Sequence, residues 1–420
     1  MDKFIVQGGT PLNGTVAISG AKNATLELMP AALLAPGAYQ FTNTPNIRDV
    51  WTMSRLMASM GVHCELNDNI LHINTANITS QEAPYSYVKQ MRASIHVLGP
   101  LVARYGYAKV SLPGGCAWGP RPVDFHLKGL EKLGAEITLD GGYIIARAKR
   151  LRGANITFDI ASVGATFNLM AAATLAHGRT VINNAAIEPE VTAAGRLLQK
   201  MGAQIEGLGT PTITIEGCDN LKPANIETIP DRVETGTLLV AVAMTGGKAT
   251  LTNTNPYHLA VVLEKLEEAG CELDIRADEI TLTAPDQLKP VDVVTAVYPG
   301  FPTDMQAQWM SLMTCAAGTS TVQETIYKDR FSHVPELARL GCDIHVSENV
   351  ATIRGGKGLT GATVMSTDLR ASVAMVLAGL VAQGQTEVLR IYHLDRGYES
   401  LELKLEALGA SIRRVKTDQL

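Results

Sequence analysis

The chain repeats one pattern six times, and this repeat constrains its fold more than any other feature. In each copy, apolar residues at helical spacing stop at a glycine, and a strand-like segment follows. A glycine suits the left-handed residue that commonly ends a helix. The six glycines are Gly61, Gly134, Gly202, Gly270, Gly341 and Gly409, at spacings of 73, 68, 68, 71 and 68 residues. We therefore predict six copies of one α/β unit.

A second, more apolar helix is predicted ahead of each of these helices. Because its residues are apolar on most faces, we expect it to be buried. The six predicted ranges are 21–35, 91–105, 163–177, 232–245, 303–317 and 369–383. A strand should lie between the two helices, and two alternating strands should follow the second. The link Asp140-Gly141-Gly142 between two such strands is typical of a hairpin turn.

The last copy is incomplete, because only one strand, at 410–415, follows its glycine. Residues 4–14 match residues 351–361 at the end of the fifth copy, so we infer that residues 1–20 complete the sixth. Six such units exceed one core, which predicts two domains of three units. We expect a C-terminal domain of residues 1–20 and 230–420, an N-terminal domain of residues 21–229, and an active site in the cleft between them.

Composition excludes several classes of protein. A net charge of −5 argues against a nucleic-acid-binding surface. No apolar run reaches the roughly 18 residues that span a bilayer, and the N-terminus lacks the layout of a signal peptide. We therefore expect a cytoplasmic protein that binds neither nucleic acid nor membrane. The 6 cysteines form no C-x-x-C pair, and no Rossmann or P-loop motif occurs, so neither a metal nor a cofactor is predicted.

Residues 112–122 form a loop that carries Cys116. This segment holds three glycines, three prolines, one thiol and Arg121, so it is neither a helix nor a central strand. Of the six cysteines, only Cys116 lies among glycines and prolines. The segment is either a tight turn with an incidental cysteine or a shaped loop that presents a thiol for chemistry.

Cations recur at the starts of the buried helices and in the loops before the second helices. Any one of them could be a solvated surface charge. Together, at helix N-termini that favour anions, they predict a site for phosphates or carboxylates. The set comprises Lys22, Arg92, Arg121, Arg330, Arg370 and Arg396. Asp304 is a candidate base among them or, alternatively, a helix N-cap. Asp124 and His126 could form a dyad or position the cysteine loop.

Five motifs resemble the UDP-N-acetylglucosamine 1-carboxyvinyltransferase family of enolpyruvyl transferases, in order and along the whole chain. The motifs lie at residues 19–23, 91–94, 112–124, 301–304 and 368–371. The resemblance implies a two-domain inside-out α/β barrel of six βαβαββ units, three per domain. It also implies transfer of the enolpyruvyl group of phosphoenolpyruvate to the 3-hydroxyl of UDP-N-acetylglucosamine, with release of phosphate. This reaction is the first committed step of peptidoglycan synthesis, and so bears on cell shape and division.

The resemblance also implies a role for each site residue. Cys116 would protonate the methylene carbon of phosphoenolpyruvate and can become attached to it, and Asp304 would take the proton of the sugar hydroxyl. The phosphate and carboxylate would be held by Lys22, Arg121 and Arg396, supported by Arg330 and Arg370. The UDP-sugar would contact Asn23, Arg92, Arg121, Pro122, Val123, Asp124, Phe125, Ser162, Val163, Gly164, Asp304 and Ile326. No obligate protein partner is evident.

Some alternatives stay open at this point. Neighbouring arginines favour a thiolate, which is a nucleophile rather than a proton donor, so the charge state of Cys116 is undecided. Ile160 stands where some members have a lysine, and Trp118 replaces a smaller apolar residue. The closest rival activity is 3-phosphoshikimate 1-carboxyvinyl transfer. A non-catalytic repeat scaffold that binds an anion is a rival of another class.

Fosfomycin should inactivate the protein, because its epoxide alkylates a cysteine in this position of the family. Mass spectrometry of the digested protein should find the adduct on the peptide that contains Cys116. A fully active protein with no adduct on that peptide would contradict the assignment.

Overall fold

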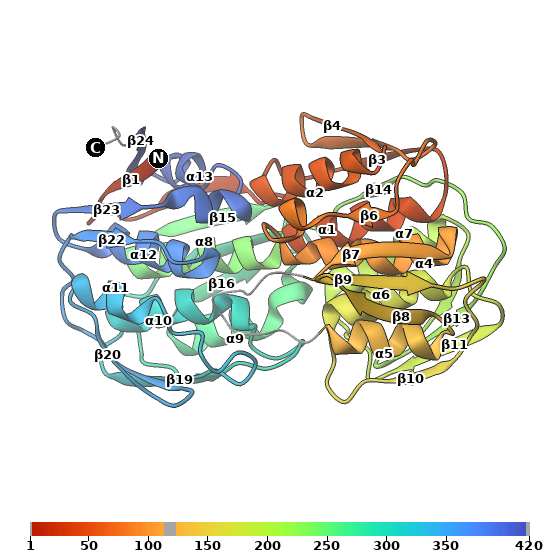
Figure 1. Cartoon of the computed structure of the whole chain (residues 1–420). Helices are drawn as coiled ribbons and strands as arrows, with labels where there is room; N and C mark the ends of the chain where they lie inside the picture. Colours follow the sequence, from red (N-terminus) through yellow and green to blue (C-terminus); the bar gives the residue numbers. More distant parts are fainter. Residues whose placement is uncertain (1, 113–122, 417–420) are drawn as a thin grey trace. The chain divides into compact units, whose positions relative to one another are not determined.

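The computed structural model describes residues 2–112 and 123–416. The chain divides into two compact units, one of Met1–Ser19 with Pro230–Leu420 and one of Gly20–Ile229 (Figure 1). We call them unit 1 and unit 2. Cys116, Trp118, Arg121 and Pro122 lie outside the described residues.

Within the described residues, each unit contains three four-stranded sheets, and all six sheets have the same strand order. In one of them β6 (Glu82–Ala83) runs parallel to β7 (Tyr107–Ser111), and β9 (Tyr143–Arg147) pairs antiparallel with both β7 and β8 (Glu136–Asp140). In the chain these strands follow the order βαβαββ. The predicted six α/β units are therefore confirmed.

The other two sheets of unit 2 repeat this order. They are β14 (Ile226–Glu227), β3 (Ala38–Thr42), β5 (Ile70–Asn74) and β4 (His63–Asn67), and β10 (Asn155–Thr157), β11 (Arg179–Asn183), β13 (Thr212–Glu216) and β12 (Gln204–Glu206). Because β14 comes from the end of unit 2 and pairs with β3 near its beginning, the unit is closed on itself.

Unit 1 contains three sheets of the same kind. They are β2 (Asn13–Ala17), β15 (Lys248–Thr252), β17 (Glu279–Thr283) and β16 (Glu272–Ile275); β18 (Val293–Val294), β19 (Thr319–Gln323), β21 (Val350–Arg354) and β20 (Asp343–Ser347); and β22 (Thr363–Met365), β23 (Gln385–Leu389), β1 (Asp2–Gln7) and β24 (Ser411–Lys416). The N-terminal strand β1 lies between β23 and β24, where Phe4 pairs with both Val388 and Arg414. In its sheet, β1 thus occupies the position that β9 and β13, the second strands of their hairpins, occupy in the other sheets.

The turn between β8 and β9 shows why local sequence predicts these hairpins. Asp140 pairs with Tyr143, and the two residues between them, Gly141 and Gly142, have φ of 54° and 82°. Two successive positive φ angles match the right-handed twist of the strands, and glycine adopts them without strain. The predicted hairpin is confirmed.

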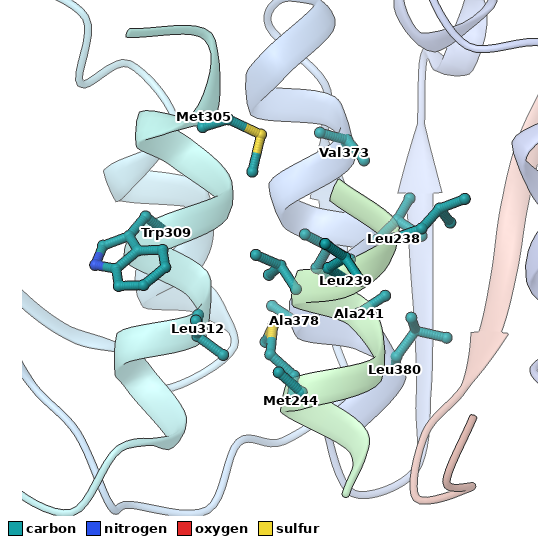
Figure 2. Packing of buried hydrophobic residues seen from close by; sticks show 14 of the residues in the cluster. Leu238, Leu239, Ala241, Met244, Met305, Trp309, Leu312, Val373, Ala378 and Leu380 are labelled. Carbon is teal, nitrogen blue, oxygen red and sulfur yellow. The ribbon is translucent and has the colours of Figure 1, made fainter. Parts of the chain in front are cut away.

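Three buried helices form the centre of unit 1. They are α8 (Arg232–Thr245), α10 (Gln306–Cys315) and α12 (Leu369–Val381), and in α8 every residue from 233 to 244 is buried. Figure 2 shows Leu312 of α10, Leu239 of α8 and Ala378 of α12 among the buried residues of this cluster. These helices are buried because nearly every face is apolar, as predicted.

Unit 2 has the corresponding helices α1 (Lys22–Ala31), α4 (Leu98–Tyr105) and α6 (Val163–Ala173). The predicted single helix at 91–105 is wrong at its start, where residues 92–97 form the 3-10 helix η2 (Arg92–Val97). Pro100 has no N–H to donate to the carbonyl four residues earlier, so an α-helix does not extend back through His96. Three α-helices also end earlier than predicted: α6 ends at residue 173, α10 at residue 315 and α12 at residue 381.

Six more amphipathic helices complete the repeats. They are α2 (Arg48–Ser59), α5 (Asp124–Lys132), α7 (Pro189–Lys200), α9 (Ala260–Glu268), α11 (Val334–Arg339) and α13 (Leu401–Ala407). The glycines that follow them have positive φ, for example 93° at Gly61 and 97° at Gly409, which confirms the predicted helix ends. Short helices η1 (Ala32–Leu34), α3 (Tyr85–Val88) and η3 (Pro256–Leu259) complete the connections. No helix in residues 2–112 and 123–416 combines the length and apolarity needed to cross a membrane.

Phe4→Ala should destabilise unit 1 by about 3–5 kcal/mol, because the ring is fully buried and its loss leaves a cavity. Leu403→Ala is the matched control, since Leu403 on α13 is 59% exposed and its truncation should change stability by less than about 0.5 kcal/mol. Urea unfolding followed by circular dichroism measures both. Equal midpoints for the two variants would contradict the placement of β1 in the core of unit 1.

Candidate active site

The candidate residues of unit 1 gather at the starts of α10 and α12. Asp304 lies in the 3-10 helix η4 (Thr303–Met305), directly before α10, and Arg370 is the second residue of α12. Asp368 caps α12, since its Oδ1 accepts hydrogen bonds from the N–H groups of Arg370 at 2.8 Å and Ala371 at 3.1 Å. This cap fixes where the helix begins and therefore where the arginine projects.

Two arginines hold the carboxylate of Asp304. Arg330 Nη1 lies 2.9 Å from Oδ1, and Arg370 Nη2 lies 2.8 Å from Oδ2. Both arginine side chains are buried, whereas the Asp304 side chain is 29% exposed. The N-cap of η4 is Pro302, so the alternative reading of Asp304 as a helix N-cap is wrong. Two fixed cations instead keep this accessible carboxylate ionised.

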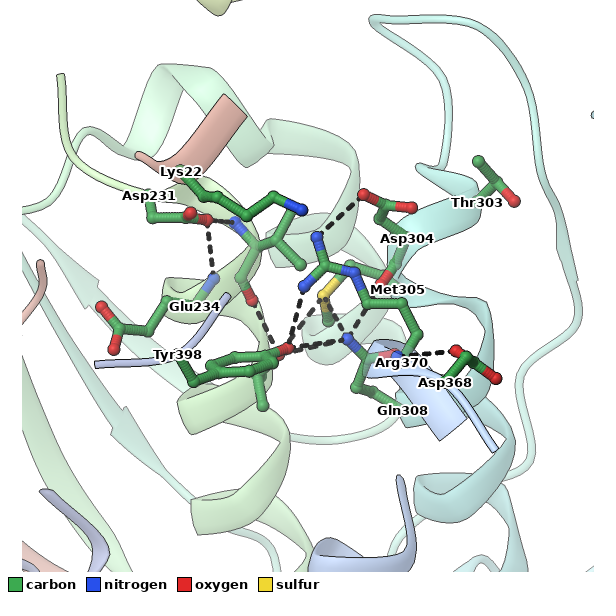
Figure 3. A network of polar contacts seen from close by, with 12 residues as sticks. Lys22, Asp231, Glu234, Thr303, Asp304, Met305, Gln308, Asp368, Arg370 and Tyr398 are labelled. Carbon is green, nitrogen blue, oxygen red and sulfur yellow. Dashed lines mark hydrogen bonds and ion pairs between the residues drawn. The ribbon is translucent and has the colours of Figure 1, made fainter. Parts of the chain in front are cut away.

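Arg370 is itself held from its other side (Figure 3). Its Nη1 donates to the hydroxyl of Tyr398 at 3.2 Å, and this hydroxyl lies 2.9 Å from Thr237 Oγ1. Gln308 Nε2 donates to the backbone carbonyl of Asp304 at 2.8 Å and also lies 3.4 Å from the Tyr398 hydroxyl. Burial lowers the pKa of Arg370, but Asp304 and Tyr398 outweigh burial and raise that pKa above its ordinary value. Arg370 is therefore a permanent cation in a fixed position.

Arg330 is oriented by a second set of polar groups. Its Nη1 donates to Thr303 Oγ1 at 2.9 Å, and Thr303 Oγ1 donates to Glu324 Oε2 at 2.8 Å. Glu324 follows β19, is fully buried, and also accepts from the N–H of Ile326 at 2.7 Å. The segment that carries Ile326 is thus attached to the same carboxylate as the segment that carries Asp304.

The candidate cations of unit 2 lie at the starts of its helices. Lys22 is the first residue of α1, and its Nζ lies 3.6 Å from Oδ2 of Asp49, a buried residue in the first turn of α2. Asn23 follows Lys22 and is half-buried, and Arg92 is the first residue of η2. Asp49 therefore orients the amine of Lys22.

The other candidates of unit 2 lie around the starts of α5 and α6. Val123 is the N-cap of α5, Phe125 packs edge-on against Phe158 with ring centroids 5.8 Å apart, and Ser162 Oγ accepts from the N–H of Ala165 at 3.4 Å. Val163 begins α6, and a Cβ on the next residue, Gly164, would lie 3.0 Å from His96 Nε2. Only glycine fits this close approach without movement of the histidine.

Asp124 and His126 do not form a dyad. Asp124 is exposed, whereas His126 is buried, with its Nδ1 2.8 Å from Nδ2 of Asn168. Whether these residues position the cysteine loop stays a prediction, because that loop lies outside the described residues. Arg396 ends the 3-10 helix η5 (Ile391–Arg396) and is half-buried.

Three important residues escaped the sequence reasoning, namely Gln308, Glu324 and Tyr398. Gln308 lies four residues after Asp304 on a buried helix, and this spacing is a signal that could have revealed it. The other two lie in irregular segments and offered no periodic signal. Within the described residues, no group of three or more histidine, cysteine, aspartate or glutamate side chains could hold a metal ion.

Comparisons with known proteins decide the family. Residues 6–405 match a family model described as EPSP synthase (3-phosphoshikimate 1-carboxyvinyltransferase). A protein of Chloroherpeton thalassium is 55% identical over 100% of this chain and 98% of its own length, and its name is UDP-N-acetylglucosamine 1-carboxyvinyltransferase. Proteins of the same name from Chlorobaculum parvum and Myxococcus xanthus are 54% and 52% identical, over 99% of this chain and 98% and 100% of their own lengths. This chain belongs to the UDP-N-acetylglucosamine 1-carboxyvinyltransferase family.

Solved structures share the fold of this chain. The enolpyruvyl transferase NikO from Streptomyces tendae has a TM-score of 0.90 and 26% identity, with 99% of each chain covered. EPSP synthase from Acinetobacter baumannii, at 19% identity and a TM-score of 0.76, covers 99% of this chain and 100% of its own and shares the fold. The predicted two-domain α/β class is confirmed, and the protein is a transferase.

The stability of unit 2 should fall as the pH drops below 6.5, because burial lowers the pKa of His126 to about 3. The unfolded chain then binds a proton that the folded chain excludes, at a cost of about 1.4 kcal/mol per pH unit between pH 6.5 and the folded pKa. His126→Gln should flatten this decline by that amount in urea unfolding at pH 7, 6 and 5. His63→Gln is the control, since this side chain is 73% exposed. An unchanged slope in His126→Gln would contradict the prediction.

Proposed function

We propose that this protein transfers the enolpyruvyl group of phosphoenolpyruvate to the 3-hydroxyl of UDP-N-acetylglucosamine and releases phosphate. Relatives of that name are more than 50% identical to it over their full length. The observation that carries the chemistry is the Asp304 carboxylate, which is partly exposed and is held between two buried arginines. Such a carboxylate is charged, oriented and accessible, as a general base must be.

The reaction needs a base on the acceptor and an acid on the donor. In the addition step the sugar O–H bond breaks, its oxygen bonds to C2 of phosphoenolpyruvate, and the methylene carbon gains a proton. Asp304 is the proposed acceptor of the hydroxyl proton, and Cys116 is the proposed donor to the methylene carbon. Loss of the methyl proton and of phosphate from the tetrahedral adduct then restores the double bond.

The donor carries a phosphate and a carboxylate, which require fixed cations. We assign Lys22, Arg121 and Arg396 to these anions, with Arg330 and Arg370 in support. The contacts of Arg370 with Tyr398 and of Lys22 with Asp49 support this assignment, because a cation that is already oriented needs no rearrangement during the reaction.

The nucleotide sugar is assigned to twelve residues. These are Asn23, Arg92, Arg121, Pro122, Val123, Asp124, Phe125, Ser162, Val163, Gly164, Asp304 and Ile326. Ile160, where some members have a lysine, is 64% exposed in the loop before α6 and brings no charge to a nucleotide phosphate. The two substrates are the proposed partners, and the proposed role is the first committed step of peptidoglycan synthesis in the cytoplasm, with its consequences for cell shape and division.

One other activity is favoured by a specific observation, the description of the matching family model as 3-phosphoshikimate 1-carboxyvinyltransferase. It differs only in the acceptor, which is shikimate 3-phosphate instead of the nucleotide sugar. A single assay that compares the two acceptors therefore distinguishes the two activities.

Phosphate release from phosphoenolpyruvate should require UDP-N-acetylglucosamine and should remain at background with shikimate 3-phosphate. A coupled colorimetric assay with each acceptor alone, both together and neither measures this. Phosphate release with shikimate 3-phosphate only would overturn the proposed acceptor. No release with either acceptor would overturn the transfer reaction itself.

A further inference from the structure

We infer that Glu324, acting through Thr303, is the permanent counter-charge of Arg330 and keeps Asp304 oriented while that residue takes up the acceptor proton. This inference rests on the proposed function, because it assigns two positioning residues to the base of that reaction. Neither residue needs to touch substrate in this role.

Glu324 is built into the protein as a fixed anion. Its side chain is fully buried, and four donors satisfy its carboxylate. Oε1 accepts from Thr295 Oγ1 at 2.9 Å and from the N–H groups of Ile326 at 2.7 Å and Tyr327 at 2.9 Å, while Oε2 accepts from Thr303 Oγ1 at 2.8 Å. A buried carboxylate with this many donors is stable as a charge.

The backbone of Glu324 is equally fixed. Its N–H donates to the carbonyl of Asn349 at 2.8 Å, and Asn349 Nδ2 donates to the carbonyl of Glu324 at 3.0 Å. These bonds attach the residue to the turn between β20 and β21. The carboxylate therefore has little freedom to follow a moving partner.

Thr303 links this anion to Arg330 in one direction. A hydroxyl has one proton, and that proton is committed to Glu324, so the Thr303 oxygen can only accept from Arg330 Nη1, at 2.9 Å. The same Nη1 lies 2.9 Å from Asp304 Oδ1. Glu324, Thr303 and Arg330 are thus joined by two charge-assisted hydrogen bonds, and an ion pair joins Arg330 to Asp304.

This series of contacts matters at the moment when Asp304 becomes neutral. Before proton transfer, the charges alternate along Glu324, Arg330, Asp304 and Arg370. Protonation of Asp304 removes the central anion, and a guanidinium without a counter-charge would be costly in this buried position. Glu324 still compensates Arg330 through Thr303, so the guanidinium stays in place and Asp304 keeps its orientation.

Glu324 also connects the base with the proposed sugar contact. Its Oε1 accepts from the N–H of Ile326, and its Oε2 fixes Thr303, the neighbour of Asp304. The Glu324 carboxylate thereby positions both Asp304 and Ile326. Loss of the Thr303 hydroxyl should disturb only Asp304, because the hydrogen bonds that Glu324 Oε1 accepts would remain.

The test compares Thr303→Val with Thr303→Ser in the full-length protein. Valine keeps the shape of threonine without the hydroxyl, so kcat of phosphate release with UDP-N-acetylglucosamine should fall about 10- to 100-fold, the effect of a lost hydrogen bond to a charged group. The Kd of UDP-N-acetylglucosamine, measured by calorimetry, should stay within about threefold. Thr303→Ser should retain kcat within about threefold, because it keeps the hydroxyl.

Thr250→Val is the matched control. Thr250 Oγ1 lies 2.8 Å from Thr281 Oγ1 between β15 and β17, so this change also removes a hydroxyl pair from unit 1, away from Asp304. It should leave kcat unchanged. Glu324→Gln, which keeps the shape of the carboxylate and removes its charge, should lower kcat at least about tenfold.

Three outcomes would overturn the inference. The first is a Thr303→Val protein with kcat within threefold of the wild type, and the second is an equal loss in Thr303→Ser. The third is a Glu324→Gln protein with wild-type kcat. A wild-type protein that releases no phosphate with UDP-N-acetylglucosamine would instead overturn the proposed function, and this inference with it.

Discussion

The burial of three almost wholly apolar helices in each unit is the constraint on which the rest of the structure depends. In α8 and α12, twelve consecutive residues are buried, and the charged side chains among them, Glu234 and Arg370, lie in the first turn. In α8, α10 and α12, charged side chains therefore occur only at or just before the helix starts, where unpaired N–H groups and caps favour them. The packing thus restricts where chemistry can occur, and Asp304, Arg370 and Lys22 all lie at such starts.

A buried charge at a helix start must be compensated, and the compensation gives the site its geometry. Arg370 pairs with Asp304 and Tyr398, and Arg330 pairs with Asp304 and Thr303. The same bonds that offset desolvation also hold each group in one orientation. Stability and preorganisation therefore have the same physical origin here, and the partly exposed Asp304 is left as the reactive member.

Sequence predicted the fold well because its signals are local and repeated. A glycine at φ 93° such as Gly61 ends a helix whatever surrounds it, and the paired glycines after Asp140 specify a hairpin without help from other residues. Six repetitions made each signal stronger. The predictions failed where one residue changed the local geometry, as Pro100 did at the start of α4, and at the final turns of several helices.

The site was less predictable because its contacts join distant segments. Sequence placed Asp304 and Arg370 at helix starts, but their pairing spans 66 residues and depends on how α10 packs on α12. Glu324 and Tyr398 carry no pattern of their own, since each lies in an irregular segment and acts only through its partners. The family resemblance supplied roles for single residues, whereas the partners that orient them became evident only from the structure.

The most direct test of the account is the turnover of Asp304→Asn, which keeps the shape of the base and removes its charge. We predict that kcat with phosphoenolpyruvate and UDP-N-acetylglucosamine falls about 10²- to 10⁴-fold, the usual contribution of a general base, while the Kd of the nucleotide sugar changes less than about tenfold. Asp286→Asn, at an exposed position of the same unit, should have no effect. A kcat of Asp304→Asn within threefold of the wild type would contradict the central role of this carboxylate.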